Sequence, residues 1–142
     1  MMRGVLLNGD ETYEIVEVDR PRPKPGEIVV RVGANGICGS DLNSFRGQNP
    51  HAKYPKLFGH EVAGHVDEVG DGVDAALLGA HVVVEPNLCC GTCRFCLDGL
   101  PNLCPDYHVL GQTPDIPGGC ADYVAVPAAN AYVLPEGIGS AE

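Results

Sequence analysis

Tryptophan is absent from the 142 residues, and only 6% of the side chains are aromatic. The chain therefore has few side chains on which the bases of a single-stranded nucleic acid can stack. Basic residues are also scarce, since nine lysines and arginines face nineteen aspartates and glutamates and the formal net charge is −10. This charge repels phosphate backbones and anionic lipid, so neither nucleic acid nor a membrane surface is an expected partner.

Long apolar runs are missing as well. The run Val5-Leu6-Leu7 near the start of the chain is too short for a signal peptide or a membrane span. We therefore expect a soluble cytoplasmic protein.

Glycine and proline, by contrast, are frequent, with 19 and 12 residues, and they separate short strand-like segments. These segments cover residues 5–7, 12–18, 27–32, 61–69, 82–84, 121–126 and 131–134. A short helix is expected over 40–46, and no longer segment has helical periodicity. The pattern predicts a single mainly β domain with a barrel or sandwich core.

Seven cysteines are unusual in a chain with no export signal. The odd number favours metal-binding thiolates over a disulfide framework. Four of them follow the spacing Cys90-x2-Cys93-x2-Cys96-x7-Cys104. Four thiolates so spaced can surround one tetrahedral Zn²⁺ and fill its coordination sphere, which predicts a structural zinc.

Alternatives remain open for these cysteines. The four can instead form two disulfides, which fit poorly with an intracellular chain, or be reduced cysteines scattered through the core. Cys89 competes with Cys90 as first ligand, and the regular two-residue step favours Cys90. Cys120 is expected to be a small apolar residue buried in a strand.

Cys38 and His60 indicate a second metal site. They lie 22 residues apart, each beside a glycine and at the junction of a strand-like and an irregular segment. Asp41 can accept the second ring N–H of His60, and Glu61 can complete a Cys-His-carboxylate set that leaves a position open, as catalytic zinc requires. The alternative is a core cysteine and an ordinary hydrogen-bonded histidine.

Four segments resemble the zinc-dependent medium-chain alcohol dehydrogenases in order and spacing. They are Gly36-Ile37-Cys38-Gly39-Ser40-Asp41, Gly59-His60-Glu61-x2-Gly64, the four-cysteine loop and Gly118-Gly119-Cys120-Ala121-Asp122-Tyr123-Val124. The Cys-Gly-Ser-Asp run is closer to the polyol and sugar dehydrogenases of this family than to its ethanol-type members.

The resemblance implies a GroES-like N-terminal catalytic domain over residues 1–142, a partly open β-barrel with short helices and a zinc-binding lobe at about 89–104. Cys38 and His60 match ligands of a catalytic zinc, and Ser40 matches the hydroxyl that takes the substrate proton. Glu61 matches a carboxylate that is a ligand in some members only. The ligands of the structural zinc match Cys90, Cys93, Cys96 and Cys104.

The implied reaction is oxidation of a small alcohol or polyol with NAD or NADP, in an enzyme expected to be a homo-oligomer. Asn43 stands where many members have a relay histidine. No Gly-x-Gly-x-x-Gly motif occurs, since Gly70-Asp71-Gly72 lacks the third glycine.

We therefore expect that the Rossmann cofactor domain and a further zinc ligand lie outside this chain, and that the chain alone is inactive. Two other classes of function stay open, namely a stand-alone, non-catalytic zinc-binding module and a redox or metal sensor that uses the thiolates.

Overall fold

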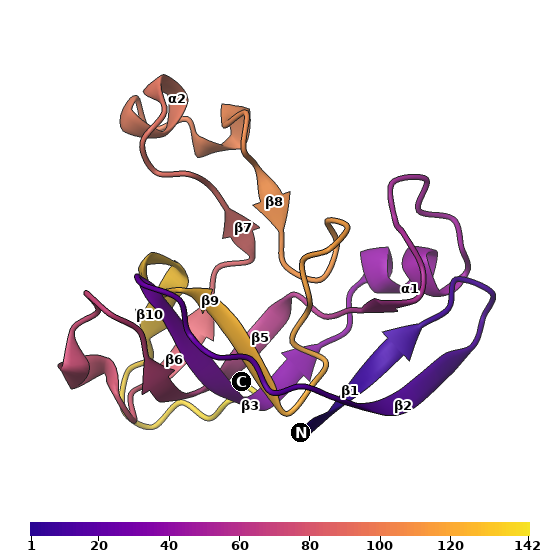
Figure 1. Ribbon diagram of the computed structural model, residues 1–142, viewed down its shortest axis with the longest axis horizontal. Helices are drawn as coiled ribbons and strands as arrows, with labels where there is room; N and C mark the ends of the chain where they lie inside the picture. Colours follow the sequence, from indigo (N-terminus) through magenta and orange to yellow (C-terminus); the bar gives the residue numbers. More distant parts are fainter.

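The computed structural model describes residues 1–142 and contains ten strands, two short α-helices and three 3₁₀ helices (Figure 1). A three-stranded sheet has the order β2-β1-β4, from β1 (Met2–Leu7), β2 (Tyr13–Val18) and β4 (Lys56–Leu57). A five-stranded sheet has the order β10-β6-β5-β3-β9, from β3 (Glu27–Gly36), β5 (Glu61–Val69), β6 (His81–Val84), β9 (Tyr123–Pro127) and β10 (Ala131–Val133). All paired strands are antiparallel.

The remaining elements connect these sheets or extend from them. A two-stranded ribbon pairs β7 (Asn87–Leu88) with β8 (His108–Val109). The helices are α1 (Gly39–Phe45), α2 (Arg94–Leu97), η1 (Ala75–Leu77), η2 (Pro101–Leu103) and η3 (Ala128–Asn130).

The hydrophobic core covers one face of the five-stranded sheet. Of its nine buried side chains, eight come from β3, β5, β6 and β9 and one from the loop after β8: Ile28, Val30, Val62, Val66, Val82, Val84, Val124, Val126 and Leu110. Burial of each such side chain contributes about 1.5–3 kcal/mol of transfer free energy. The valine-rich strands thus form the rigid scaffold of the protein.

The two sheets do not close into a complete barrel. They meet at a bridge between Gly4 and Ala121, beside which the Val5 N–H donates to the Cys120 carbonyl at 2.9 Å. Strand β2 remains at the edge of its sheet. The predicted mainly β, partly open barrel is therefore confirmed.

Most predicted segments correspond to observed elements. The strands expected over 27–32, 61–69 and 82–84 are β3, β5 and β6, and the helix expected over 40–46 is α1, one residue earlier. The short elements β4, β7, β8, α2 and η2 were not predicted. Each has only two to four residues, so sequence periodicity cannot indicate them.

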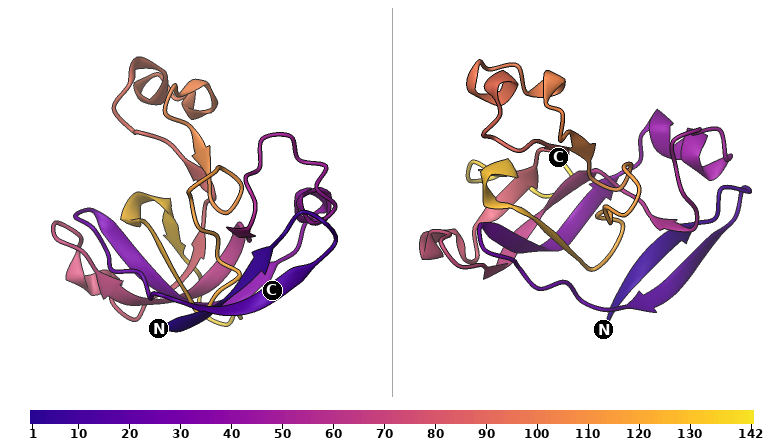
Figure 2. Two further views of the ribbon diagram at one scale, coloured as in Figure 1. Left: turned by 45° about the vertical axis from the view of Figure 1, so that its right-hand side comes forward. Right: turned by 45° about the horizontal axis from the view of Figure 1, so that its top comes forward.

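The segment 89–104, called the cysteine lobe below, projects from the body of the protein. Figures 1 and 2 show α2 and η2 at the far end of the β7–β8 ribbon, away from both sheets. Its large apolar side chains are largely in solvent, with Leu97 74% exposed and Leu103 51% exposed. The lobe therefore has no hydrophobic core of its own.

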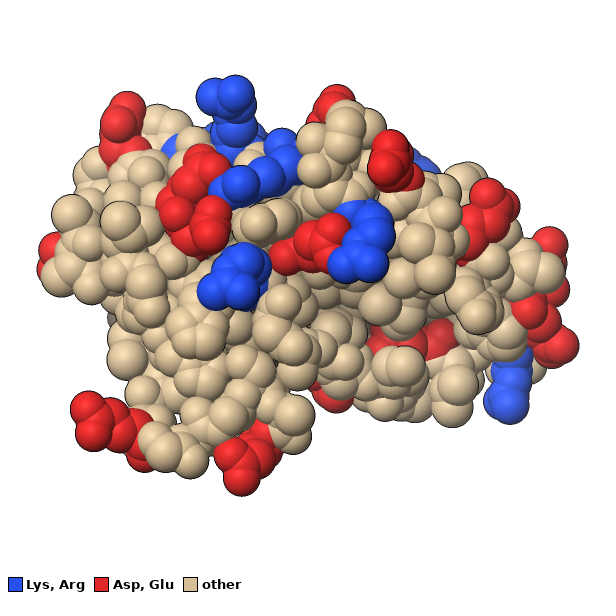
Figure 3. All heavy atoms as spheres, turned by 90° about the horizontal axis from the view of Figure 1, so that it is seen from below, with Lys and Arg blue, Asp and Glu red and all other residues tan.

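Charged side chains are mixed on the surface. On the face in Figure 3, basic side chains lie beside acidic ones and form no continuous basic patch. Arg20, for example, pairs with Asp67 and Glu68. No helix of the structure is long and apolar enough to cross a membrane.

Candidate metal centres

The cysteine lobe brings four sulfur atoms together. The Sγ atoms of Cys90, Cys93, Cys96 and Cys104 all lie within 4.8 Å of one another. Individual separations are 3.5 Å for Cys93–Cys96, 3.6 Å for Cys104–Cys90 and 3.9 Å for Cys90–Cys96. A tetrahedron with Zn–S bonds of about 2.3 Å has S–S edges of about 3.8 Å. The four cysteines therefore fit one zinc ion.

The environment of these thiols is asymmetric. Backbone N–H groups of Thr92 and Cys93 lower the pKa of Cys90 to about 6. Burial, together with hydrogen bonding to neighbouring thiols, raises the pKa of Cys96 to about 12. Because zinc binds the deprotonated form of each thiol, zinc binding would release the protons that these cysteines carry.

Cys89 and Cys120 belong to neither cluster of candidate ligands. Cys89 Sγ lies 3.4 Å from the Pro101 carbonyl oxygen, so the structure places Cys90, and not Cys89, among the four sulfurs. Cys120 is half-buried and lies just before β9, not inside it, and burial raises the pKa of its thiol. All seven cysteines are unpaired, which argues against the disulfide alternative.

Cys38 and His60 meet because of the strand register. Gly36, at the end of β3, pairs with Glu61, at the start of β5, so the residues just beyond these two ends are neighbours. Cys38 Sγ lies 3.2 Å from His60 Nε2. Asp41 Oδ1 lies 3.5 Å from His60 Nδ1. These three residues, called the second cluster below, have ligand atoms within 4.8 Å of one another.

Helix α1 holds two of the surrounding side chains in place. Asp41 is only 2% exposed, and its Oδ2 accepts the Cys38 backbone N–H at 3.0 Å. Ser40 Oγ is exposed and lies 2.9 Å from Cys38 Sγ and 3.5 Å from His60 Nε2. A hydroxyl group thus stands at the two atoms that would hold a metal.

Glu61 is not brought into the second cluster. The Glu61 side chain is exposed, and its carboxylate lies over Gly36, so close that a Cβ at position 36 would collide with it. Its assignment as a ligand stays a prediction.

Gln112 belongs to the surroundings of the second cluster, although no sequence motif indicated it. Its Nε2 lies 3.0 Å from Asp41 Oδ1, 3.4 Å from Ser40 Oγ and 3.2 Å from His60 Nδ1. The preceding Gly111 has a φ of +64°, and a Cβ there would meet the Gly59 carbonyl oxygen at 2.5 Å. The glycine allows the close approach that brings Gln112 beside His60.

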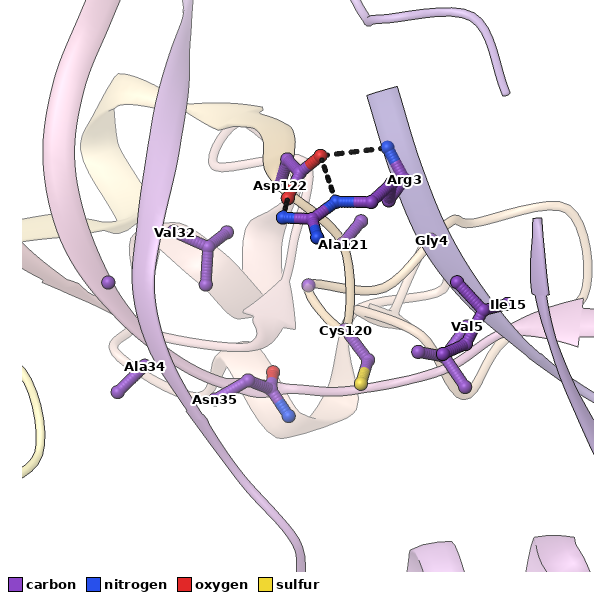
Figure 4. A pocket seen from close by; sticks show the side chains of 12 residues that line it. Arg3, Gly4, Val5, Ile15, Val32, Ala34, Asn35, Cys120, Ala121 and Asp122 are labelled. Carbon is purple, nitrogen blue, oxygen red and sulfur yellow. Dashed lines mark hydrogen bonds and ion pairs between the residues drawn. The ribbon is translucent and has the colours of Figure 1, made fainter. Parts of the chain in front are cut away.

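A separate cavity of about 360 Å³ lies where the two sheets diverge (Figure 4). Arg3 and Asp122 form an ion pair at its rim, at 2.9 Å between Nη2 and Oδ1, and Cys120 and Asn35 line it. None of the residues of the two sulfur-containing clusters lines this cavity.

Comparison with known proteins gives a family match that covers most of the chain. Residues 24–136 match the family described as Alcohol dehydrogenase GroES-like domain. The chain belongs to this family. Membership in the alcohol dehydrogenase GroES-like domain family confirms the resemblance drawn from the sequence motifs.

Several members of the family are similar to the chain. The starvation-sensing protein RspB of Escherichia coli K12 is 44% identical over 96% of this chain and 40% of its own length. The crystal structure of the alcohol dehydrogenase rspB from E. coli CFT073, complexed with NADH, is 42% identical over 98% of this chain and 40% of that one, with a TM-score of 0.88.

The names of two further relatives mention a metal or a polyol phosphate. An uncharacterized zinc-type alcohol dehydrogenase-like protein of Haemophilus influenzae is 33% identical over 96% of this chain and 40% of its own length. Galactitol-1-phosphate dehydrogenase from E. coli is 34% identical, with a TM-score of 0.89 over 98% of this chain and 40% of that one. The chain thus spans about 40% of the length of these relatives.

Proposed function

We propose that this chain is the zinc-binding, N-terminal catalytic-domain portion of an NAD- or NADP-dependent dehydrogenase that oxidises a small alcohol or polyol. The observation that carries the proposal is the 3.2 Å contact of Cys38 Sγ with His60 Nε2, with the Ser40 hydroxyl beside both atoms. The relatives complexed with NADH or named for galactitol-1-phosphate support the cofactor and the substrate class.

The residues of the second cluster suit a catalytic zinc. A thiolate and an imidazole are ordinary zinc ligands. Two protein ligands leave two of the four coordination positions of a tetrahedral zinc open for other groups. Zinc bound there would polarise the alcohol oxygen and lower its pKa. Glu61 is proposed as an additional carboxylate near this site.

The chain's own residues perform the proton part of the reaction. Ser40 Oγ accepts the proton of the alcohol oxygen and, being exposed, passes its own proton to water. Asp41 faces Nδ1 of His60 and holds the ring so that Nε2 faces Cys38. NAD⁺ or NADP⁺, when bound, would supply the acceptor for the hydride that the alcohol carbon gives up, leaving a carbonyl product.

The remaining features of the enzyme follow from this proposal. Cys90, Cys93, Cys96 and Cys104 hold a structural zinc. Because residues 1–142 contain no dinucleotide-binding glycine motif, we expect no hydride transfer by this polypeptide alone. The seven free thiols suit a cytoplasmic enzyme, and we expect the complete enzyme to be a homo-oligomer.

A chimera tests the function. Residues 1–142 would replace the matching part of E. coli RspB, whose structure has been solved with NADH. We expect the chimera to reduce NAD⁺ or NADP⁺ with at least one member of a panel of alcohols and polyols, and the same chimera with Cys38→Ser to lose this rate. A chimera that holds two zinc ions and binds NADH, yet reduces neither cofactor or reduces it equally well without Cys38, would contradict the proposal.

A further inference from the structure

The orientation of the Gln112 amide is determined from the side opposite the second cluster. Its Oε1 lies 3.2 Å from Lys56 Nζ, on β4, and 3.4 Å from Ser44 Oγ, on α1. An ammonium group can only donate hydrogen bonds, so the carbonyl oxygen of the amide must face Lys56. A reversed amide would place its NH₂ group against the ammonium and its oxygen against the Asp41 carboxylate. Lys56 therefore directs the NH₂ end of Gln112 toward the second cluster.

The two hydrogens of Gln112 Nε2 have three potential acceptors. Asp41 Oδ1 is the nearest, at 3.0 Å, and a buried carboxylate needs such partners. If the second hydrogen went to His60 Nδ1, the ring proton would have to sit on Nε2, the atom that faces Cys38. Donation to Ser40 Oγ instead leaves Nδ1 free to carry the proton, with Asp41 Oδ1 facing it at 3.5 Å.

In the second arrangement both hydrogens of Gln112 Nε2 point to Asp41 and Ser40 and not to His60 Nδ1, 3.2 Å away. His60 Nε2 then presents a free lone pair beside Cys38 Sγ. Ser40 Oγ accepts from Gln112 and directs its own hydrogen toward Cys38 Sγ, 2.9 Å away. Only this arrangement is compatible with a metal at Cys38 and His60.

We propose that Gln112, held by Lys56, is a positioning residue that keeps Asp41 and Ser40 oriented so that His60 carries its proton on Nδ1 and offers Nε2 as a ligand. The inference deepens the proposed function and rests on it. Side chains that orient a metal ligand typically change metal affinity 10- to 100-fold when they are replaced.

Two pairs of variants separate positioning from folding. Gln112→Leu removes both ends of the amide, and Gln112→Glu keeps the size and the contact with Lys56 but loses the NH₂ group. Lys56→Met frees the amide to turn, and Lys56→Arg keeps a donor-only cation. All are made in the 142-residue chain, with an unchanged far-UV circular dichroism spectrum and urea unfolding midpoint as the control for folding.

Two measurements are made on each protein. Chelator competition gives the zinc affinity of the second cluster, and ¹⁵N NMR of the metal-free second cluster shows which nitrogen of His60 carries the proton. We expect the Nδ1–H form in the wild type, about 10-fold weaker zinc in both Gln112 variants with loss of the single tautomer, a smaller loss in Lys56→Met and wild-type behaviour in Lys56→Arg.

The inference is overturned if wild-type His60 carries its proton on Nε2, or if Gln112→Leu keeps both the zinc affinity and the tautomer of the wild type. If Gln112→Leu does not fold by circular dichroism, equal zinc affinities in Lys56→Met and Lys56→Arg overturn the inference. Failure of the proposed function differs, because the wild type would then bind no second zinc. In that case the tautomers of the wild type and the variants alone decide the inference.

Discussion

The two sulfur-containing clusters of this protein are held together in different ways. The four clustered cysteines of the lobe come from a segment of 15 residues, 90–104, whose apolar side chains are mostly exposed. The second cluster joins residues 22 positions apart at the ends of β3 and β5, beside a carboxylate that is 2% exposed. We therefore expect the lobe to depend on a bound metal for its order, whereas the strand ends of the sheet position the second cluster.

This difference separates two kinds of stability. A segment without a core gains its folding free energy from the bound metal, and structural zinc supplies about 10–16 kcal/mol in small peptides. A site at strand ends takes its geometry from the buried valines beneath it, with or without metal. Loss of zinc should therefore disorder the cysteine lobe alone, and loss of core packing should disrupt the second cluster.

The largest effect is expected from Cys93→Ser. The lobe should lose its zinc and become sensitive to protease between residues 89 and 104, because the metal supplies most of its order. Hydrogen exchange in β3, β5 and β6 should not change, since their burial does not involve the lobe. Cys120→Ser, outside the cluster, is the matched control. A lobe that stayed protected in Cys93→Ser would show that metal does not hold it.

Cys38→Ser tests the other side of the comparison. Elemental analysis should give one zinc fewer per chain than the wild type, while the lobe keeps its own ion and remains resistant to protease. The midpoint of urea unfolding should shift little, since Cys38 lies beyond the end of β3 and outside the core. Loss of both zinc ions in this variant would mean that the clusters are not independent.

Ile28→Ala should distinguish the scaffold from the lobe. Ile28 is fully buried on β3, and such a truncation costs about 2–5 kcal/mol of unfolding free energy. Far-UV circular dichroism should show unfolding at a lower urea concentration than in the wild type. With zinc near saturation, the second cluster should release its zinc in this same transition, and the lobe should release its own at a higher urea concentration. Ile15→Ala is the control, since Ile15 is 70% exposed and its loss should cost less than about 0.5 kcal/mol. Simultaneous release of both ions would contradict the expectation.

The smallest effect is expected from Asp122→Asn. Hydrogen bonds from Arg3 lower the pKa of Asp122, so the carboxylate stabilises the fold above its unfolded pKa of about 3.9 and loses this effect as the pH falls through its lower, folded value. The variant should be slightly less stable at neutral pH and equal to the wild type in acid, with unchanged zinc content. Asp71→Asn, at an unpaired carboxylate, should match the wild type throughout. A difference that persisted in strong acid would contradict the ion-pair explanation.

The sequence predicts those parts of the fold and of the two sites that are formed by residues close together in the chain. Two-residue steps place Cys90, Cys93 and Cys96 on one short turn, so a local pattern contains their geometry. Likewise, β3, β5 and β6 are rich in valine, a β-branched residue that favours strands.

Contacts between residues far apart in the sequence could not be predicted from a local pattern. Gln112 is 71 residues from Asp41 and 56 from Lys56, and only the path of the chain after β8 brings the three together. A glutamine in a glycine- and proline-rich loop has no periodicity and no motif. The short elements β4 and β7 were missed for a related reason, since two residues are too few to show alternation.

The β7–β8 ribbon has a consequence for how this region can vary among related proteins. Asn87 pairs with Val109 and Leu88 with His108, so the chain leaves the body and returns to it at adjacent points. An excursion with paired ends can be lengthened, shortened or replaced by a tight hairpin turn at little cost in loop-closure entropy, because each doubling of a loop costs only about 0.6 kcal/mol. The lobe can therefore be gained, reshaped or lost in evolution while the path of the strands around it is preserved.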